Sequence, residues 1–218
     1  IIKNDGKYIY TVRNENDKIL IYKPDGKSVK KMSEIAYNMD EGNYINDIFL
    51  YKNNLIVQSN SFNGDYDIFT NIDIYSLADI KNPKKIHSFK QQGSYVSSRI
   101  TSDSLLFISN KEIYSHLCKT DKDYLPQTTL DGTEKAVEPK DICVVDNSKS
   151  ASYLIVSKLD LVSKKMTTET KAIAGAGSTV YCNENNLYVA NAVFDVRDTA
   201  KKDEAVIDSD FAFSNQDY

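Results

Sequence analysis

Apolar residues recur along the chain in short runs, and a small polar turn precedes four of these runs. Asn, Asp, Gly and Ser tolerate the backbone of the tight turns that link neighbouring strands. Between the runs, apolar and polar residues alternate, which is the period of a strand with one buried face. The pattern predicts an all-β chain. The four copies are NDGKYIYTVRN (4–14), YKNNLIVQSN (51–60), TSDSLLFISN (101–110) and NENNLYVAN (183–191).

The spacing of these copies predicts a β-propeller. The first three apolar anchors, Tyr8, Leu55 and Leu106, lie 47 and 51 residues apart, and a propeller blade takes about 40–50 residues. Further alternating segments follow each anchor, as in a four-stranded antiparallel blade. We therefore predict a small or partial propeller that occupies the chain as one domain, residues 1–218. The expected blades are 1–47, 48–92, 93–177 and an incomplete blade at 178–218.

The third interval is longer, because 81 residues separate Leu106 from Leu187. The excess lies in 111–141, which is polar, lacks steady alternation and holds two of the four prolines. We expect this segment to be an insertion loop on the third blade. Elsewhere, SVKKMSEIAYNM (28–39) is the place where two or three helical turns compete with a strand.

Composition narrows the classes of partner. The chain is 41% hydrophobic and carries a formal net charge of −4, with lysines scattered among a slight excess of acids. A nucleic-acid partner is therefore not expected. No apolar run approaches the roughly 20 residues that cross a bilayer, and no signal peptide is recognisable. We expect no membrane span in this chain.

Four segments point to a known family. They are IIKNDGKYIYTV (1–12), DIYSLADIKNPKKIHSFKQQGSYVSSR (73–99), YLIVSKLDL (153–161) and AGAGSTVYCNENNLYVAN (174–191). The second segment is the most specific, because it joins a strand, DIKNP and SFKQQGSYVSSR in one order. Together the segments resemble the bacterial secreted proteins with a C-terminal β-propeller domain. The resemblance implies roughly the N-terminal half of the family's domain, remaining blades C-terminal to this chain, and an extracellular or cell-surface location. It supplies no established activity and no catalytic residues.

The sequence shows no catalytic constellation. Of the two histidines, His87 and His116, only the second lies near a cysteine, and sequence proximity alone orients no nucleophile. AGAGST (174–179) lacks the spacing of a phosphate-binding loop, and GSYVS (93–97) lacks the second glycine of a nucleophile elbow. We predict no catalytic residues. The sequence leaves enzymatic activity undecided and leans towards a non-enzymatic role.

One short segment suggests a cation site. NGDYDIF (63–69) places Asn63, Asp65 and Asp67 at alternate positions, as in the start of a calcium loop. The full loop needs a bidentate Glu at the twelfth position, and Ile74 stands there. The segment is therefore either a turn or a weak Ca²⁺ site, and no other cofactor is expected. Asp65 and Asp67 are also candidates for ligand binding.

The three cysteines, Cys118, Cys143 and Cys182, form no metal-binding pair by spacing. They are either inert thiols or include one Cys118–Cys143 disulfide, which an exported protein would permit.

The stretch QQGSYVSSR (91–99) is interpreted as the crossing into the inner strand of the third blade. Strict alternation then puts Tyr95, Ser97 and Arg99 on one face of that strand. Tyr95 and Arg99 become candidates for ligand binding in the channel. Arg99 has two open roles, a contact between blades or a contact to a channel ligand.

These features predict an exported cell-surface β-propeller that recognises a protein or a glycan without catalysis. Loops at the ends of the blades, particularly 61–69 and 111–141, would form the contact surface. One alternative is a carbohydrate-active hydrolase or lyase with carboxylates at the channel mouth. A second alternative is a calcium-stabilised structural module.

Overall fold

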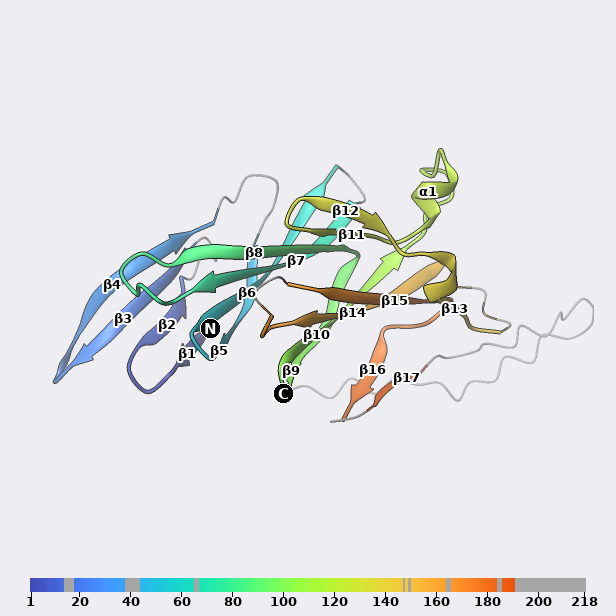
Figure 1. Cartoon of the computed structure of the whole chain (residues 1–218). Coiled ribbons are helices and arrows are strands. Elements are labelled where there is room, and N and C mark those ends of the chain that lie inside the picture. The colour runs from blue at the N-terminus through green and yellow to red at the C-terminus, as the bar shows by residue number, and fades with distance from the viewer. Residues whose placement is uncertain are drawn as a thin grey trace, which may run out of the picture.

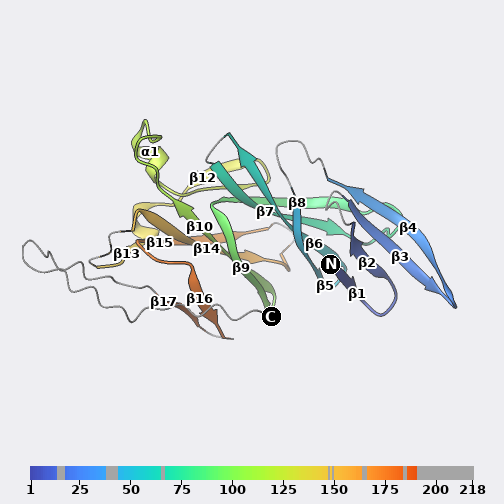
Figure 2. The same ribbon diagram turned by 180° about the vertical axis from the view of Figure 1, so that it is seen from behind.

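The structure, a computed structural model, describes residues 1–13, 18–37, 44–64, 67–146, 148, 150–163, 166–183 and 186–190. Its regular secondary structure is almost entirely strand, as predicted. Figures 1 and 2 show four sheets lying side by side, from β1–β4 at one end to β16–β17 at the other. The sheets are numbered 1 to 4 in chain order.

Sheets 1 and 2 begin as simple antiparallel meanders in which sequential strands pair. Sheet 1 consists of β1 (Ile2–Asn4), β2 (Ile9–Val12), β3 (Lys18–Asp25) and β4 (Ser28–Ala36). Sheet 2 consists of β5 (Tyr44–Tyr51), β6 (Asn54–Asn63), β7 (Asp67–Ser76) and β8 (Lys84–Gln92), with β11 (Gln127–Leu130) and β12 (Thr133–Ala136) added beyond β8.

Sheet 3 repeats the same meander, and sheet 4 is a hairpin in the described residues. Sheet 3 consists of β9 (Ser94–Thr101), β10 (Ser104–Glu112), β14 (Ser152–Asp160) and β15 (Thr168–Ala174), with β13 (Ile142–Val144) added in parallel beyond β15. Sheet 4 consists of β16 (Thr179–Cys182) and β17 (Leu187–Ala190).

The segment 28–39, where the sequence left a strand and helical turns open, begins with the strand β4, because its apolar Ile35 faces the core between sheets 1 and 2. The number of strands in two sheets differs from the sequence-based expectation. Sheets 2 and 3 have six and five strands, where four were expected. The expected division at residue 47 falls inside β5, whereas those at 92 and 177 fall between sheets.

Each interface between neighbouring sheets holds its own hydrophobic core. Strand β6 lies in the middle of sheet 2 and serves two of them. Its Leu55 and Val57 face sheet 1, and its Ile56 faces sheet 3, because successive side chains point to opposite faces. All three are fully buried. The continuous apolar run LIV therefore reports a strand that is covered on both faces.

The core between sheets 2 and 3 combines aromatic packing with a buried polar network. Phe89 and Phe107 meet edge to face, with ring centroids 6.3 Å apart. Beside them, the buried Gln91 of β8 donates to Ser109 Oγ at 2.8 Å and to the carbonyl of Ile155 at 3.2 Å. Ser157 Oγ donates to Gln91 Oε1. These bonds satisfy a buried amide and fix the register of the two sheets, since an unpaired buried amide costs about 1–3 kcal/mol.

The segment 111–141 is not a simple loop, so this prediction was wrong in form. It contains the helix α1 (Asp121–Tyr124), the hairpin β11–β12 and the 3-10 helix η2 (Pro139–Asp141). The hairpin pairs with the outer edge of sheet 2, and the chain then returns to the outer edge of sheet 3 through β13. The physical reason is that β8 and β15 each offer an edge of unpaired backbone groups.

A single carboxylate holds the hairpin turn against β8. Asp131 accepts the backbone N–H of Ser88 at 2.8 Å and lies 2.9 Å from His87 Nδ1. These partners outweigh the effect of desolvation and lower the pKa of Asp131. His87 is thus a structural partner of the inserted hairpin.

The crossing from β8 to β9 depends on Gly93, which has a φ of +98°. A Cβ at this position would lie 2.5 Å from the carbonyl oxygen of Asn110. We expect Gly93→Ala to destabilise the fold by about 3 kcal/mol or more, because backbone strain and a clash add. Urea unfolding measures this loss.

Gly132 is a matched control, since its φ is +83° and a Cβ at this position would have no other atom within 4 Å. Gly132→Ala should therefore lower the free energy of unfolding only by the cost of a left-handed backbone, about 1–2 kcal/mol. Equal losses in the two variants would contradict a close approach at Gly93.

Candidate functional site

A cleft of about 760 Å³ opens where several connections meet at one end of sheets 2 and 3. We call it the loop cleft. The helix α1 projects at this end of the molecule (Figures 1 and 2). The cleft is bounded by Asp67 and Ile68 of β7, by the crossing 92–94, by 110–112 of β10, by residues of the following segment 113–123, and by Gln127 and Glu134 of the hairpin.

The β8–β9 crossing forms a rigid floor for the loop cleft. The N–H of Gly93 donates to the carbonyl of Ile68 at 2.7 Å, and the buried Thr70 hydroxyl donates to the carbonyl of Gly93 at 2.7 Å. Asn110 packs against the same glycine. The strands β7 and β10 therefore hold the crossing in place from its two sides.

Lys111 and two glutamines hold the wall that contains α1. Lys111 Nζ donates to the carbonyls of Asp123 at 3.0 Å and Leu125 at 3.3 Å. Gln127 donates its side-chain amide to the carbonyl of Lys122 at 3.1 Å and its backbone N–H to Gln92 Oε1 at 2.9 Å. Desolvation lowers the pKa of Lys111, and nearby Asp67 partly opposes that effect. Lys111 therefore stabilises the cleft wall through hydrogen bonds within the protein.

The carboxylate of Asp123 closes the turn before α1. Its Oδ2 accepts the backbone N–H groups of Lys119 and Thr120, each at 2.8 Å. These two bonds, that of Thr120 first, lower the pKa of Asp123. A general acid needs a raised pKa, so Asp123 is unsuited to that role.

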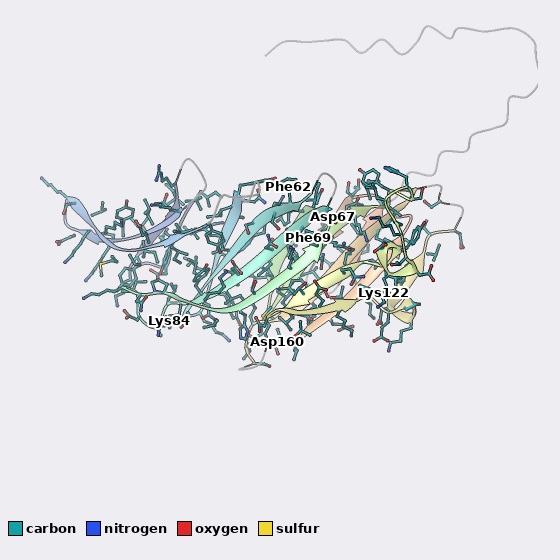
Figure 3. All side chains as sticks on the ribbon, turned by 90° about the horizontal axis from the view of Figure 1, so that it is seen from above. Phe62, Asp67, Phe69, Lys84, Lys122 and Asp160 are labelled. Atoms are coloured by element: carbon teal, nitrogen blue, oxygen red, sulfur yellow. The ribbon has the colours of Figure 1, made fainter. Side chains whose placement is uncertain are left out.

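The remaining lining groups combine both signs of charge with an aromatic ring. Figure 3 views the molecule from above and shows the charged cleft residues Asp67 and Lys122 in the same half of the molecule, whereas Lys84, which does not line the cleft, lies in the other half. Tyr114 is 41% exposed and lies beside His116, with ring centroids 6.1 Å apart. The cleft can thus offer hydrogen-bond donors, acceptors and an apolar ring face to a bound molecule.

The structure places the predicted cation ligands only in part. Asp67 is exposed at the start of β7 and lines the loop cleft, and its backbone is paired with that of Asn63. Asp65 lies outside the described residues. Among the residues that the structure describes, no three His, Cys, Asp or Glu side chains form a group that could hold a metal. The calcium site stays a prediction.

Tyr95 is partly buried against the core and lines no part of the loop cleft. A β-bulge inserts Val96, so Tyr95 pairs with Ser109 while Ser97 pairs with Ile108. The bulge turns Tyr95 into the core between sheets 2 and 3, where its ring lies 6.2 Å from that of Phe107 on β10 and its hydroxyl 2.9 Å from Ser98 Oγ. The expectation that Tyr95 shares a face with Arg99 was therefore wrong.

Arg99 joins sheets 3 and 4. Its Nη1 donates to the backbone carbonyl of Cys182, which is the contact between blades that the sequence left open. A small cavity of about 80 Å³ lies beside this contact and is lined also by Ser97 and Tyr181. The structure thus shows one of the two roles considered for Arg99, and ligand contact stays a prediction.

All three cysteines are free, so the Cys118–Cys143 disulfide considered above is not present. Cys118 follows β10 on the wall of the loop cleft, and its Sγ contacts the carbonyl of Tyr114 at 3.5 Å. Cys143 is exposed on β13, at the outer edge of sheet 3. The two thiols therefore lie in different parts of the structure, Cys118 within the insertion and Cys143 in the strand that follows it.

The sequence pointed to the two connections that meet at the cleft but not to most of its residues. Lys111, Gln92 and Gln127 carry no motif, and only pairing of β11 with β8 brings them together. The sequence indicated the place of the cleft only through the prediction that the loops 61–69 and 111–141 lie at the ends of the blades.

Antiparallel meanders packed face to face, with connections gathered at the blade ends, define the β-propeller architecture. A family model described as Beta propeller domain matches residues 1–217, and the chain belongs to this family. Membership indicates a general binding or structural role. Neither the curated proteins nor the solved structures yielded a match to the chain. In the described part of the chain, no helix is long and apolar enough to cross a membrane.

The contact made by Arg99 predicts a local effect of substitution. Arg99→Lys removes the planar group that reaches Cys182, so we expect a loss of about 1 kcal/mol. Hydrogen exchange should become faster in β16 and β17 and stay unchanged in β1 and β2. Unchanged exchange in sheet 4 would leave Arg99 without a structural role.

The capping role of Asp123 predicts a step in acid. Because its pKa is depressed, its stabilising effect is present above the ordinary value of 3.8 and is lost as the pH falls through the lower folded value. The amide NMR shifts of Lys119 and Thr120 should report this step. The step should disappear in Asp123→Asn and persist in the control Asp121→Asn; persistence in both would assign it to another group.

Proposed function

We propose that this chain is a recognition module that binds a glycan or a protein segment in the loop cleft without catalysing a reaction. The observation that supports the proposal is the cleft itself. Its volume of about 760 Å³ falls within the roughly 300–1,000 Å³ of sites for small ligands. Its floor and wall are held by internal hydrogen bonds, so the site is preformed in the free protein.

The proposal extends to location and to the rest of the propeller. The resemblance to exported bacterial proteins supports an extracellular or cell-surface location. The sheets of the described residues form an open row (Figure 1), and propellers close with about 4–8 blades. We include in the proposal further blades C-terminal to this chain.

Filling the cleft tests the proposal. Ser94 is exposed, lines the cleft and begins β9, so Ser94→Trp should occupy the site with little effect on the fold. We expect the wild-type chain to retain a ligand on a glycan array or in a pull-down of surface proteins. Ser94→Trp should weaken that retention at least tenfold.

Lys84→Trp is the control, since Lys84 is the exposed first residue of β8 and does not line the cleft. This variant should bind as the wild type does. Equal binding by all three proteins would place recognition elsewhere, and no retained ligand for the wild type would defeat the recognition function.

A further inference from the structure

We infer that the loop cleft takes a short, electrically neutral oligosaccharide. The inference rests on the recognition function proposed above and narrows its ligand to one chemical class. Three features of the cleft carry it: its balanced charges, its uncommitted hydrogen-bonding side chains and its exposed aromatic ring.

The charges that line the cleft nearly cancel. Three lysines face four carboxylates, and neither sign is gathered on one wall, because both occur on the 111–123 segment. A polyanion or a polycation would meet as many repulsive as attractive groups, which disfavours it. The lining charges are Lys111, Lys119, Lys122, Asp67, Glu112, Asp123 and Glu134.

Side chains around the cleft divide into those that hold the wall and those that face a ligand. Lys111, Gln92 and Asp123 bond within the wall. In contrast, the side chains of Asp67 and Asn110 make no hydrogen bond to another described residue. A carboxylate accepts, and an amide both donates and accepts. Sugar hydroxyls match such a set, because each hydroxyl can donate and accept.

The cleft offers little strand edge to an extended peptide. β-Strand addition needs an unpaired strand edge. In the described structure, β7, β8 and β10 are each paired on both sides. The edge strands β9 and β12 line the cleft through one residue each, Ser94 and Glu134, which is too short an edge for strand addition.

Tyr114 supplies an apolar face beside these polar groups. Its ring is 41% exposed in the wall that follows β10, and Leu117 in the same wall is equally exposed. An amphipathic ring beside polar side chains suits a sugar, which has C–H faces and hydroxyl edges. We expect one sugar unit to stack on Tyr114 while its hydroxyls reach Asp67 or Asn110.

An array that carries neutral, anionic and cationic glycans, followed by titration with chitotriose, cellotriose and maltotriose, tests the inference. We expect binding to neutral glycans, with less than about a twofold change in Kd between roughly 50 and 500 mM NaCl. Charged ligands would weaken far more, since salt screens exposed charges beyond about 10 Å at 0.1 M.

Two substitutions locate the sugar. Tyr114→Ala should raise Kd at least tenfold, and Tyr114→Phe should keep it within threefold, because the ring persists. Tyr124→Ala is the matched control: Tyr124 is 39% exposed on α1 but does not line the cleft. Asp67→Asn should weaken binding about three- to tenfold. Circular dichroism checks that each variant is folded.

The outcomes separate the two proposals. Binding restricted to charged glycans, or a bound peptide that Ser94→Trp abolishes, would overturn the neutral-sugar inference and leave the recognition function intact. Equal effects of Tyr114→Ala and Tyr124→Ala would overturn the placement of the sugar. If neither glycans nor surface proteins bind, both proposals fail.

Discussion

The structure depends on burial of both faces of its central sheets. β6 supplies Leu55 and Val57 to one core and Ile56 to the next, so three neighbouring residues connect three sheets. Complete burial of each such side chain contributes about 1.5–3 kcal/mol. A single sheet of this protein could not cover its own apolar faces, because alternation exposes one half of the side chains on either side. The sheets must therefore pack against one another for the chain to fold.

Polar contacts determine how the stacked sheets meet and where a site can form. The network around Gln91 fixes sheet 2 against sheet 3. The tight crossing at Gly93 then brings the ends of β7, β8 and β10 together. The insertion adds β11 and β12 to the outer edge of sheet 2, the strand β13 that follows it joins the outer edge of sheet 3, and the α1 segment becomes the wall of the cleft. The same elements that join two blades thus create the binding surface between their loops.

Much of the architecture was predictable, while the identity of the site residues was not. Alternation and repeat spacing predict strands and blades because both depend on local sequence. The expectation that Tyr95 shares a strand face with Arg99 failed because one bulged residue, Val96, reverses the face of the residues before it. The prediction for 111–141 failed because short strands such as β11 form only against an existing edge. Lys111 resembles any exposed lysine until its two carbonyl partners fold beside it.

The sequence by itself determined that the chain is all-β, that its strands come in blade-like groups, and that polar connections lie between them. Hydrophobic periodicity suffices for this, since it records which residues of each strand leave water. Only the tertiary structure decided that the insertion bridges two sheets, that Arg99 caps a carbonyl of sheet 4, and that Asp67, Asn110 and Tyr114 surround one cleft. These relations join residues far apart in the chain through backbone pairing and close packing, and no local pattern encodes them.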